Sequence, residues 1–299
     1  MKNRLFVIGN GFDLAHNLPT AFDPDFKNIA NKIEPAYFWD IYQSRKDEIW
    51  SDFENLLGCP DFNNLEQIFD GFEPDYLAES ESARDDIIFQ SMVNGHLQDV
   101  LREFAENAER SLTFKKRKID FEQLLDLDAY YISFNYTHVL EKLYNIPTYN
   151  VLHIHGEVGN DNLILGYPEG NFTPEKYRYD ATLRGHYVET TIQEYISNID
   201  DIYVRKAYEH LYDKCKSFSK KPRISCLEFF LENVEINEII VYGHSCAIDF
   251  EYFDFLNVKY PNAVWVFYTN DEKQEINVKN LQKKCGIEIV SLEKCFRSI

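Results

Sequence analysis

Polar residues that could bind or cleave a small molecule follow four short apolar runs of this chain. Glycine, asparagine, histidine and serine in such places suit contacts with ribose, amide and phosphate groups, because open α/β sheets bind ligands at the carboxyl ends of their strands. One polar strand end would be ordinary loop polarity, but four of them predict a binding site. The four segments are Gly9-Asn10-Gly11, Ser133-Phe134-Asn135-Tyr136-Thr137, His153-Ile154-His155-Gly156 and Tyr242-Gly243-His244-Ser245.

The first of these segments joins an apolar run at residues 5–8 to the start of a helix at Phe12-Asp13. Glycine has no Cβ to block a phosphate or ribose, and a helix N-terminus offers free N–H groups. Leu14 stands where the dinucleotide fingerprint has its third glycine, and the lysine of a P-loop is missing. The segment therefore predicts either a nucleotide contact or a tight turn without a ligand.

His155 is the candidate base, because an imidazole with an unperturbed pKa of about 6.5 exchanges protons near neutral pH. A histidine bonded to a backbone carbonyl is the structural alternative. His153 lies on the same face of the expected strand, where it would support His155. The pair could also begin a metal site, but no further ligands are evident, so we expect no metal. Ala247 replaces the second glycine of a nucleophile elbow, which argues against catalysis by Ser245.

Six short runs rich in β-branched and aromatic residues are the expected strands that position these segments. Most of them are apolar on both faces, as strands of a covered parallel sheet are. Helical patterns lie between them, for example at residues 250–260. This alternation predicts an α/β fold with a doubly wound, mainly parallel, six-stranded, Rossmann-like sheet. The expected strands are residues 5–8, 130–133, 151–154, 239–242, 264–267 and 287–290.

Two long segments, residues 26–128 and 168–233, interrupt this rhythm and are expected to be helical insertions in a single domain spanning residues 1–299. Apolar spacing predicts helices at residues 37–57, 87–110 and 190–215. Residues 71–86 combine acids with a proline and few apolar residues, which predicts a mobile loop. Residues 50–54 are either an amphipathic helix with its acids outward or a lid that turns Glu54 toward a ligand.

The composition excludes several classes of protein. A total of 31 Lys and Arg against 50 Asp and Glu gives a net charge of −19, which argues against a nucleic-acid surface. The basic residues 115–118 are expected to be a solvated loop. No apolar run approaches ~20 residues and no signal peptide is evident, so we expect a cytoplasmic protein without a membrane span. The six cysteines form no C-x-x-C pair, which predicts reduced thiols rather than structural zinc ligands.

Several motifs occur in a fixed order along nearly the whole chain, from Val7 to about Asp249. They are Gly9-Asn10-Gly11-Phe12-Asp13-Leu14, Leu18-Pro19-Thr20, Trp50-Ser51-Asp52-Phe53-Glu54, Phe134-Asn135-Tyr136-Thr137, His153-Ile154-His155-Gly156 and Tyr242-Gly243-His244-Ser245. This combination resembles the bacteriophage abortive infection AbiH family. That family is in turn similar to the sirtuin-like fold, a six-stranded parallel sheet that binds NAD.

The sirtuin-like resemblance implies a role for each segment. It implies NAD as substrate or ligand, with Leu18-Pro19-Thr20 at the place of the flexible cofactor loop. Asn135 would support attack at the nicotinamide ribose, and His155 would be the catalytic histidine. The implied cofactor-binding residues are Gly9, Asn10, Gly11, Phe12 and Asp13 around the pyrophosphate, Thr137 near the nicotinamide, and Gly243, His244 and Ser245 on the adenosine side.

This sequence also departs from the sirtuin pattern. Thr137 stands in place of an aspartate, and His244 in place of a threonine. The zinc module of protein deacetylases is absent, so the resemblance implies water, rather than an acetyl-lysine peptide, as the acceptor. An asparagine amide can hold a ribose hydroxyl or a water without adding charge, and a positioned histidine can act as the base.

Two functions of different classes follow. The first is a phage-defence effector that hydrolyses NAD at the nicotinamide–ribose bond. The second is a non-catalytic nucleotide-binding sensor or partner module of a defence system. The 20 tyrosines and 23 phenylalanines are expected first in the core and in surface packing, and a contact patch is the second interpretation, because aromatic residues are enriched at interfaces. The expected partners are therefore a nucleotide together with a second copy of the chain or a defence-system protein.

Overall fold

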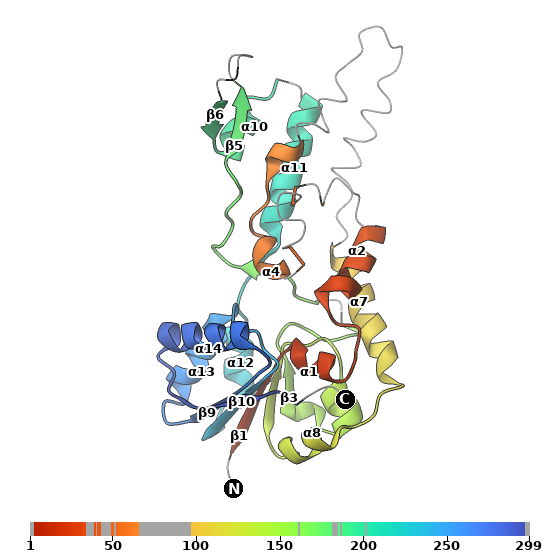
Figure 1. The fold of residues 1–299 in the computed structure, drawn as a ribbon, viewed down its shortest axis with the longest axis vertical. Helices are drawn as coiled ribbons and strands as arrows, with labels where there is room; N and C mark the ends of the chain where they lie inside the picture. The colour runs from red at the N-terminus through yellow and green to blue at the C-terminus, as the bar shows by residue number, and fades with distance from the viewer. Residues whose placement is uncertain are drawn as a thin grey trace. The chain divides into compact units, whose positions relative to one another are not determined.

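The protein has a central sheet of six parallel strands in the order β10-β9-β8-β1-β2-β3 (Figure 1). The structure is a computed structural model that describes residues 3–33, 39, 41–42, 49–50, 52–65, 97–160, 162–180, 185, 187–200 and 202–296. The predicted α/β class and parallel sheet are confirmed. The strands are β1 (Arg4–Ile8), β2 (Tyr130–Ser133), β3 (Val151–His153), β8 (Glu238–Tyr242), β9 (Val264–Thr269) and β10 (Ile289–Lys294).

This strand order reverses direction between β1 and β8, which are hydrogen-bonded neighbours with Val7 opposite Val241. In a doubly wound sheet the two connections that leave such a point run to opposite faces, so the strand ends there are the usual place for a ligand. The loops after β1 and β8 both carry glycines that the sequence singled out. The topology therefore brings together two of the four predicted segments.

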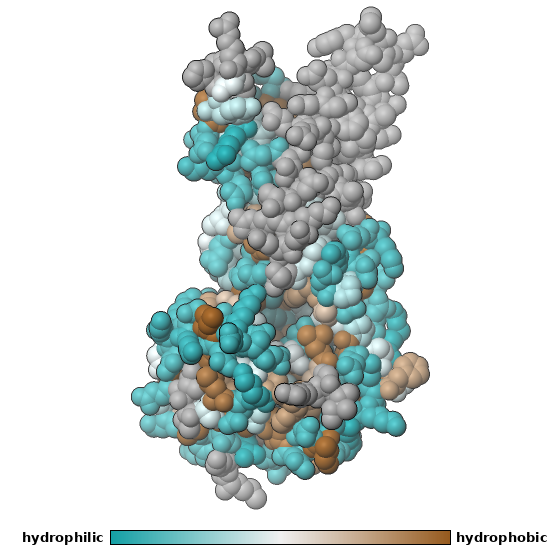
Figure 2. Space-filling view, in the orientation of Figure 1, coloured by the Kyte–Doolittle hydropathy of each residue, from teal (hydrophilic) through white to brown (hydrophobic). Residues whose placement is uncertain are grey.

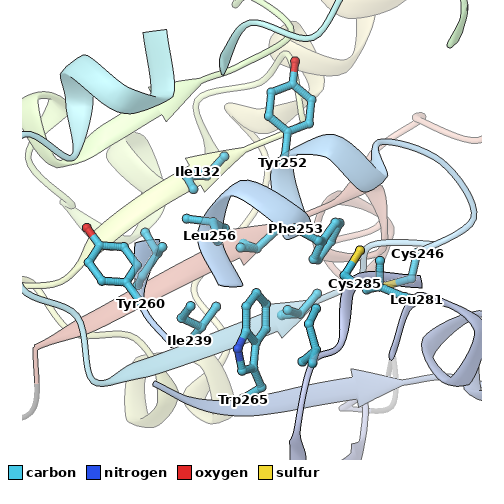
Figure 3. Packing of buried hydrophobic residues seen from close by; sticks show 14 of the residues in the cluster. Ile132, Ile239, Cys246, Tyr252, Phe253, Leu256, Tyr260, Trp265, Leu281 and Cys285 are labelled. Atoms are coloured by element: carbon cyan, nitrogen blue, oxygen red, sulfur yellow. The ribbon is translucent and has the colours of Figure 1, made fainter. Parts of the chain in front are cut away.

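The sheet is buried on both faces, which explains the apolar runs of its strands. Alternate residues of β1 point to opposite sides: Leu5 and Val7 belong to one buried cluster, whereas Phe6 and Ile8 belong to another. Figure 3 shows the first cluster, in which Trp265 of β9 packs near Phe253 of a covering helix. The helices that supply side chains to this face are α12 (Ile224–Phe230), α13 (Phe250–Lys259) and α14 (Glu272–Cys285).

The opposite face is covered by residues of α1 (Asn10–Ala15), α8 (Ile119–Leu124), α9 (Val139–Tyr144) and the end of α7 (Leu97–Leu112). Its centre is aromatic, with Phe12 in edge contact with Phe121 at 4.8 Å between ring centroids. His16 belongs to this core and not to a binding site. Its ring is held by the Phe12 carbonyl and the Tyr144 hydroxyl, and burial lowers its pKa to about 4.

The chain divides into two compact units, and the sheet belongs to the first, residues 1–21, 101–164 and 221–299. The second unit consists of Phe22–Val100 and Leu165–Lys220. Its buried tyrosines include Tyr42 and Tyr167, which both donate hydrogen bonds to backbone carbonyls. Its elements are η1 (Phe22–Phe26), α2 (Lys27–Ile33), α4 (Phe53–Leu56), η3 (Phe62–Asn64), β4 (Tyr167–Pro168), β5 (Tyr177–Asp180), β6 (Tyr187–Thr190), α10 (Ile192–Ser197), α11 (Ile202–Ser217) and β7 (Ser219–Lys220).

Several predicted elements differ in their bounds. The helix expected at residues 190–215 is two helices: α10, which Thr191 caps and which ends at Ser197, and α11, which begins at Ile202. The last strand starts two residues later than expected, after α14 ends at Cys285 and Gly286 caps it in the left-handed region. The helix predicted at residues 87–110 is described only from Leu97 onward. The mobile loop predicted at residues 71–86 lies outside the described residues.

The polarity of the surface and the free state of the cysteines agree with the composition of the chain. Figure 2 shows a mainly hydrophilic surface over the described residues on this face, with hydrophobic side chains in small separate groups. All six cysteines are described and are free thiols. Among the described helices, none has the length and apolar character needed to cross a membrane.

Candidate functional site

The loops after β1 and β8 pack backbone against backbone. Gly9 N–H donates to the Tyr242 carbonyl at 3.0 Å, and Gly11 N–H donates to the Gly243 carbonyl at 2.8 Å. A Cβ at Gly11 would lie 2.6 Å from Gly243 Cα, and Gly243 itself has φ +68. These glycines are therefore required by the contact between the two loops.

This packing bears on the predicted pyrophosphate contact. The N–H groups of Gly9 and Gly11 are already engaged, and Phe12 N–H donates to the Gly9 carbonyl at 2.9 Å. A phosphate bound by these groups would require them to exchange partners. The Asn10 side chain donates to the Thr20 carbonyl at 2.6 Å, so the Leu18-Pro19-Thr20 segment is tied to this loop. The phosphate position stays a prediction.

A buried carboxylate connects the first and second predicted segments. Asp13 Oδ1 accepts a hydrogen bond from Asn135 Nδ2 at 2.8 Å, and Asp13 Oδ2 accepts one from the Thr137 hydroxyl at 2.6 Å. Asn135 Nδ2 also donates to the Gly9 carbonyl at 3.1 Å. Burial raises the pKa of Asp13 to about 7, although the hydrogen bonds from Thr137 and Asn135 act in the opposite direction. Asp13 thus fixes the two polar side chains that follow β2.

His155 is buried at the end of the third segment. Its side chain lies edge-on to Phe134 at 5.0 Å between ring centroids, and 5% of the residue is exposed. Its Nε2 atom has no hydrogen-bond partner among the described residues. The Asp249 carboxylate lies 3.7 Å from this atom, which is too long for a hydrogen bond. Most buried polar atoms in folded proteins have a hydrogen-bond partner, so this nitrogen is one of the described atoms that still have bonding capacity to use.

His244, at the end of the fourth segment, shares the same carboxylate. Its Nδ1 accepts the Cys246 backbone N–H at 3.0 Å, so a neutral ring carries its proton on Nε2. That Nε2 atom lies 3.9 Å from Asp249 Oδ2. Phe134 contacts His244 at 4.5 Å between ring centroids, as it does His155. The structure thus brings two predicted histidines to opposite oxygens of one buried aspartate.

The sequence did not single out Asp249 as a site residue. It precedes α13 as the N-cap and has φ +65. An aspartate just before a helical pattern is usually the N-cap of that helix. The sequence therefore gives no reason to assign the carboxylate to a binding site. Ser245 is the opposite case. It is exposed, and its hydroxyl accepts a bond from Ala247 N–H at 3.4 Å.

His153 contacts a different set of groups from His155. Its strand ends at His153, and residues 154–155 form a turn, so alternation along a strand does not place the two rings. His153 Nδ1 donates to the Asn135 carbonyl at 2.9 Å, and His153 Nε2 faces Glu141 Oε1 at 2.9 Å. Burial alone would lower the pKa of His153, but the hydrogen bond and charge of Glu141, the Asn135 carbonyl and the charge of Glu157 together raise it.

Beside His153 lies a group of charged residues that the sequence did not single out. His138 Nδ1 is 3.0 Å from Glu109 Oε1, and Lys142 donates to the same oxygen at 2.6 Å. Burial would raise the pKa of Glu109, but hydrogen bonds from His138 and Lys142 lower it to about 2. The bond with Glu109 raises the pKa of His138. Spacing along the chain gives no signal for this group, because its members come from α7, α9 and the loops after β2 and β3.

Glu54 belongs to the second unit, where its carboxylate accepts from the Lys220 ammonium at 2.8 Å. The Lys220 side chain is almost fully buried. This ion pair is the observed role of the Glu54 carboxylate. The sequence left two interpretations open, a helix with Glu54 facing solvent and a lid that turns Glu54 toward a ligand. An ion pair with Lys220 matches neither of them.

Comparisons with known proteins identify the family of this chain. Comparison with the curated proteins gives no significant match. A family model, described as bacteriophage abortive infection AbiH, matches residues 5–269 and therefore covers β1 to β9 and all four predicted segments. The chain belongs to the AbiH family, and that membership implies a role in bacteriophage abortive infection.

Proposed function

We propose that this chain is an abortive-infection effector that binds NAD at the carboxyl ends of β1, β2, β3 and β8 and hydrolyses its nicotinamide–ribose bond. The observation that carries the proposal is His155 Nε2, a buried nitrogen without a described hydrogen-bond partner, 3.7 Å from Asp249. A base held in this way can accept a proton from a water that enters beside it. Family membership supplies the biological setting, and the strand order supports a nucleotide at this edge of the sheet.

The proposed reaction is a substitution at C1′ of the nicotinamide ribose. The C–N bond breaks and its electron pair leaves with nicotinamide, which becomes neutral, while a water oxygen bonds to C1′. The proton of this water passes to His155 Nε2, and the nearby Asp249 carboxylate stabilises the resulting imidazolium. The products are nicotinamide, ADP-ribose and one proton.

Asn135 would position the water or a ribose hydroxyl. Its amide nitrogen is bound to Asp13 and to the Gly9 carbonyl, so its orientation is fixed and its Oδ1 is the atom that would accept from the substrate. The Gly9 and Gly11 amides already donate to backbone carbonyls, so Asn135 assigns the ribose to this end of the strands, and a pyrophosphate there would have to displace those bonds.

The test is direct measurement of NAD turnover by the purified full-length protein. Nicotinamide and ADP-ribose are quantified by chromatography after incubation with NAD. General-base catalysis contributes about 10²–10⁴-fold, so His155→Ala should slow cleavage by that factor. His210→Ala, a partly buried histidine of α11 in the second unit, is the matched control and should keep the wild-type rate. A His155→Ala protein that cleaves NAD at the wild-type rate would overturn the assignment.

Thr137 favours a second candidate, the non-catalytic nucleotide-binding sensor. Threonine has no carboxylate at the position where the sirtuin pattern has an aspartate. The Thr137 hydroxyl already donates to Asp13, so it is not available to recognise nicotinamide as that aspartate would. Calorimetry with NAD separates the two functions. Binding without release of nicotinamide under any tested condition supports the sensor, whereas release that depends on His155 supports the enzyme.

A further inference from the structure

Three potential metal ligands converge beside β3. His138, His153 and Glu157 each offer one ligand atom, and these atoms lie within 4.8 Å of one another. Glu157 Oε2 is 3.1 Å from His138 Nε2 and 3.9 Å from His153 Nε2. Ligands that bind zinc at about 2.0–2.2 Å are separated from each other by roughly 3–4 Å, so only small shifts are needed.

The hydrogen bonds of the two imidazoles call for positive charge at this place, supplied either by protons or by a metal ion. His153 Nδ1 faces the Asn135 carbonyl, which can only accept, so this nitrogen carries a proton. Its Nε2 faces Glu141 Oε1 at 2.9 Å, which is also an acceptor when ionised. His138 is similar, with Glu109 at Nδ1 and Glu157 at Nε2. A neutral imidazole has one donor, so each ring requires either a second proton or a metal ion at Nε2.

The local charge favours the same conclusion. Three carboxylates, those of Glu109, Glu141 and Glu157, surround the two rings, and Lys142 is the ammonium that pairs with Glu109. Glu141 is about nine-tenths buried, and its Oε2 has no hydrogen-bond partner among the described residues. Two protonated histidines would balance the two negative charges that Lys142 leaves, and one divalent cation that replaces their Nε2 protons would balance the same charge.

We propose that this group is a binding site for a zinc-like divalent transition metal, with His138 Nε2, His153 Nε2 and Glu157 as ligands and Glu141 as the fourth. Glu109 and the Asn135 carbonyl would hold the Nδ1 atoms, as carboxylates and backbone carbonyls commonly do behind metal-bound histidines. Nitrogen and oxygen donors of this kind suit zinc and cobalt. The Glu157 side chain is 42% exposed, which gives the ion a path from solvent.

This site differs from the metal site that the sequence suggested and that we expected to be absent. His155 contacts Phe134 and Asp249, whereas His153 is placed with His138 and Glu157. The bound ion would join the loop after β2, helix α9 and the loop after β3. Its effect on Asn135 would pass through the backbone carbonyl that His153 holds.

The experiment titrates cobalt(II) into full-length protein that has been stripped with a chelator. We expect one cobalt per chain, visible d–d absorption of a four- or five-coordinate ion, no thiolate charge-transfer band, and displacement by zinc. Absence of stoichiometric binding in the wild type, or a thiolate band that shows cysteine ligation, would overturn the proposal.

Variants locate the site independently of any NAD chemistry. His138→Gln and Glu157→Gln remove ligands that are partly exposed, and circular dichroism checks that both fold. Each should weaken cobalt binding by more than the roughly 10–100-fold typical of an outer-shell change, and Glu109→Gln should fall within that range. Glu232→Gln, an exposed glutamate of the same unit, is the control and should bind as the wild type does. Wild-type affinity in both ligand variants would place the ion elsewhere.

Discussion

Asn135 Nδ2 donates to Asp13 Oδ1 at 2.8 Å and so joins the loop after β2 to the helix that follows β1. The same carboxylate accepts from Thr137, and its pKa of about 7 results from burial. A carboxyl group that titrates near neutral pH therefore holds the side chains of Asn135 and Thr137. The free energy of unfolding should depend on its protonation state.

We expect Asp13→Asn to flatten the pH dependence of stability. The pKa of Asp13 is raised from 3.8 to about 7, so the folded state binds the proton more tightly than the unfolded chain does. The stability due to this proton is full below about pH 4 and is lost as pH rises through 7. The difference corresponds to roughly 4 kcal/mol at most.

An asparagine at this position keeps both hydrogen bonds, because its oxygen can accept from Asn135 and its amide can donate to the Thr137 hydroxyl. Thermal unfolding between pH 4 and pH 8 is the measurement. The variant should equal or exceed the wild type at pH 8, and its advantage should shrink toward pH 4. Parallel curves for the two proteins would contradict the assigned burial effect.

The packing of the two glycine loops predicts that Gly11→Ala destabilises the fold. The new Cβ would lie 2.6 Å from Gly243 Cα, and backbone on both sides must move. Overpacking of this kind costs roughly 1–3 kcal/mol, and a backbone contact falls at the upper end. Gly286→Ala is the control, because its Cβ meets nothing within 4 Å although φ is +67; its cost is about 1–2 kcal/mol. Chemical denaturation should rank Gly11→Ala as the less stable, and the reverse order would refute the close contact.

Expression in cells tests the proposed effector. If the wild type is toxic or aborts infection, Asn135→Ala and His155→Ala should both lose the effect, since one positions the substrate and the other takes the proton. His210→Ala should retain it. Cell survival and the cellular NAD level are measured together at matched protein abundance. Toxicity that persists in His155→Ala while NAD falls would show that another residue is the base.

The Glu54–Lys220 pair predicts a strong coupling within the second unit. Removing one partner of a buried ion pair costs about 3–5 kcal/mol, because the other charge is left in a poor environment. Glu54→Leu should therefore be markedly destabilising, whereas the double variant Glu54→Leu/Lys220→Met should recover much of the loss. A double-mutant cycle in urea measures this coupling. Additive losses would mean that the pair contributes little.

The parallel sheet was predictable because its central strands β1, β2 and β8 are buried on both faces and their sequences are short apolar runs. The prediction of all six strands is confirmed, and β10 begins at Ile289, two residues later than predicted, after the cap of α14 at Gly286. The same argument placed the four polar segments at one edge of the sheet, since parallel strands end on the same side. What the pattern could not give was the length of β3, which ends before His155.

The partners of the site residues were beyond the sequence because they come from distant elements. The sequence around Asp249 predicts a helix N-cap, but in the folded chain its carboxylate lies beside His155 and His244. Glu109 and Glu141 lie on helices whose charged faces would ordinarily be taken as solvated. Nothing in their spacing indicates that these helices meet at His138 and His153. Such contacts follow from tertiary packing rather than from local propensity.

The position of β1 in the middle of the sheet has a consequence for folding during synthesis. Its neighbours are β2 and β8, and the Arg4–Glu238 ion pair at this seam spans 234 residues of chain. At about 5–20 residues per second, the ribosome needs roughly 10–50 s to deliver the second neighbour after the first strand emerges. At least one edge of β1, whose residues 5–8 are all apolar, is open throughout that interval. Nascent chains should therefore depend on chaperones until β8 is made, and slowing translation beyond β3 should increase their aggregation.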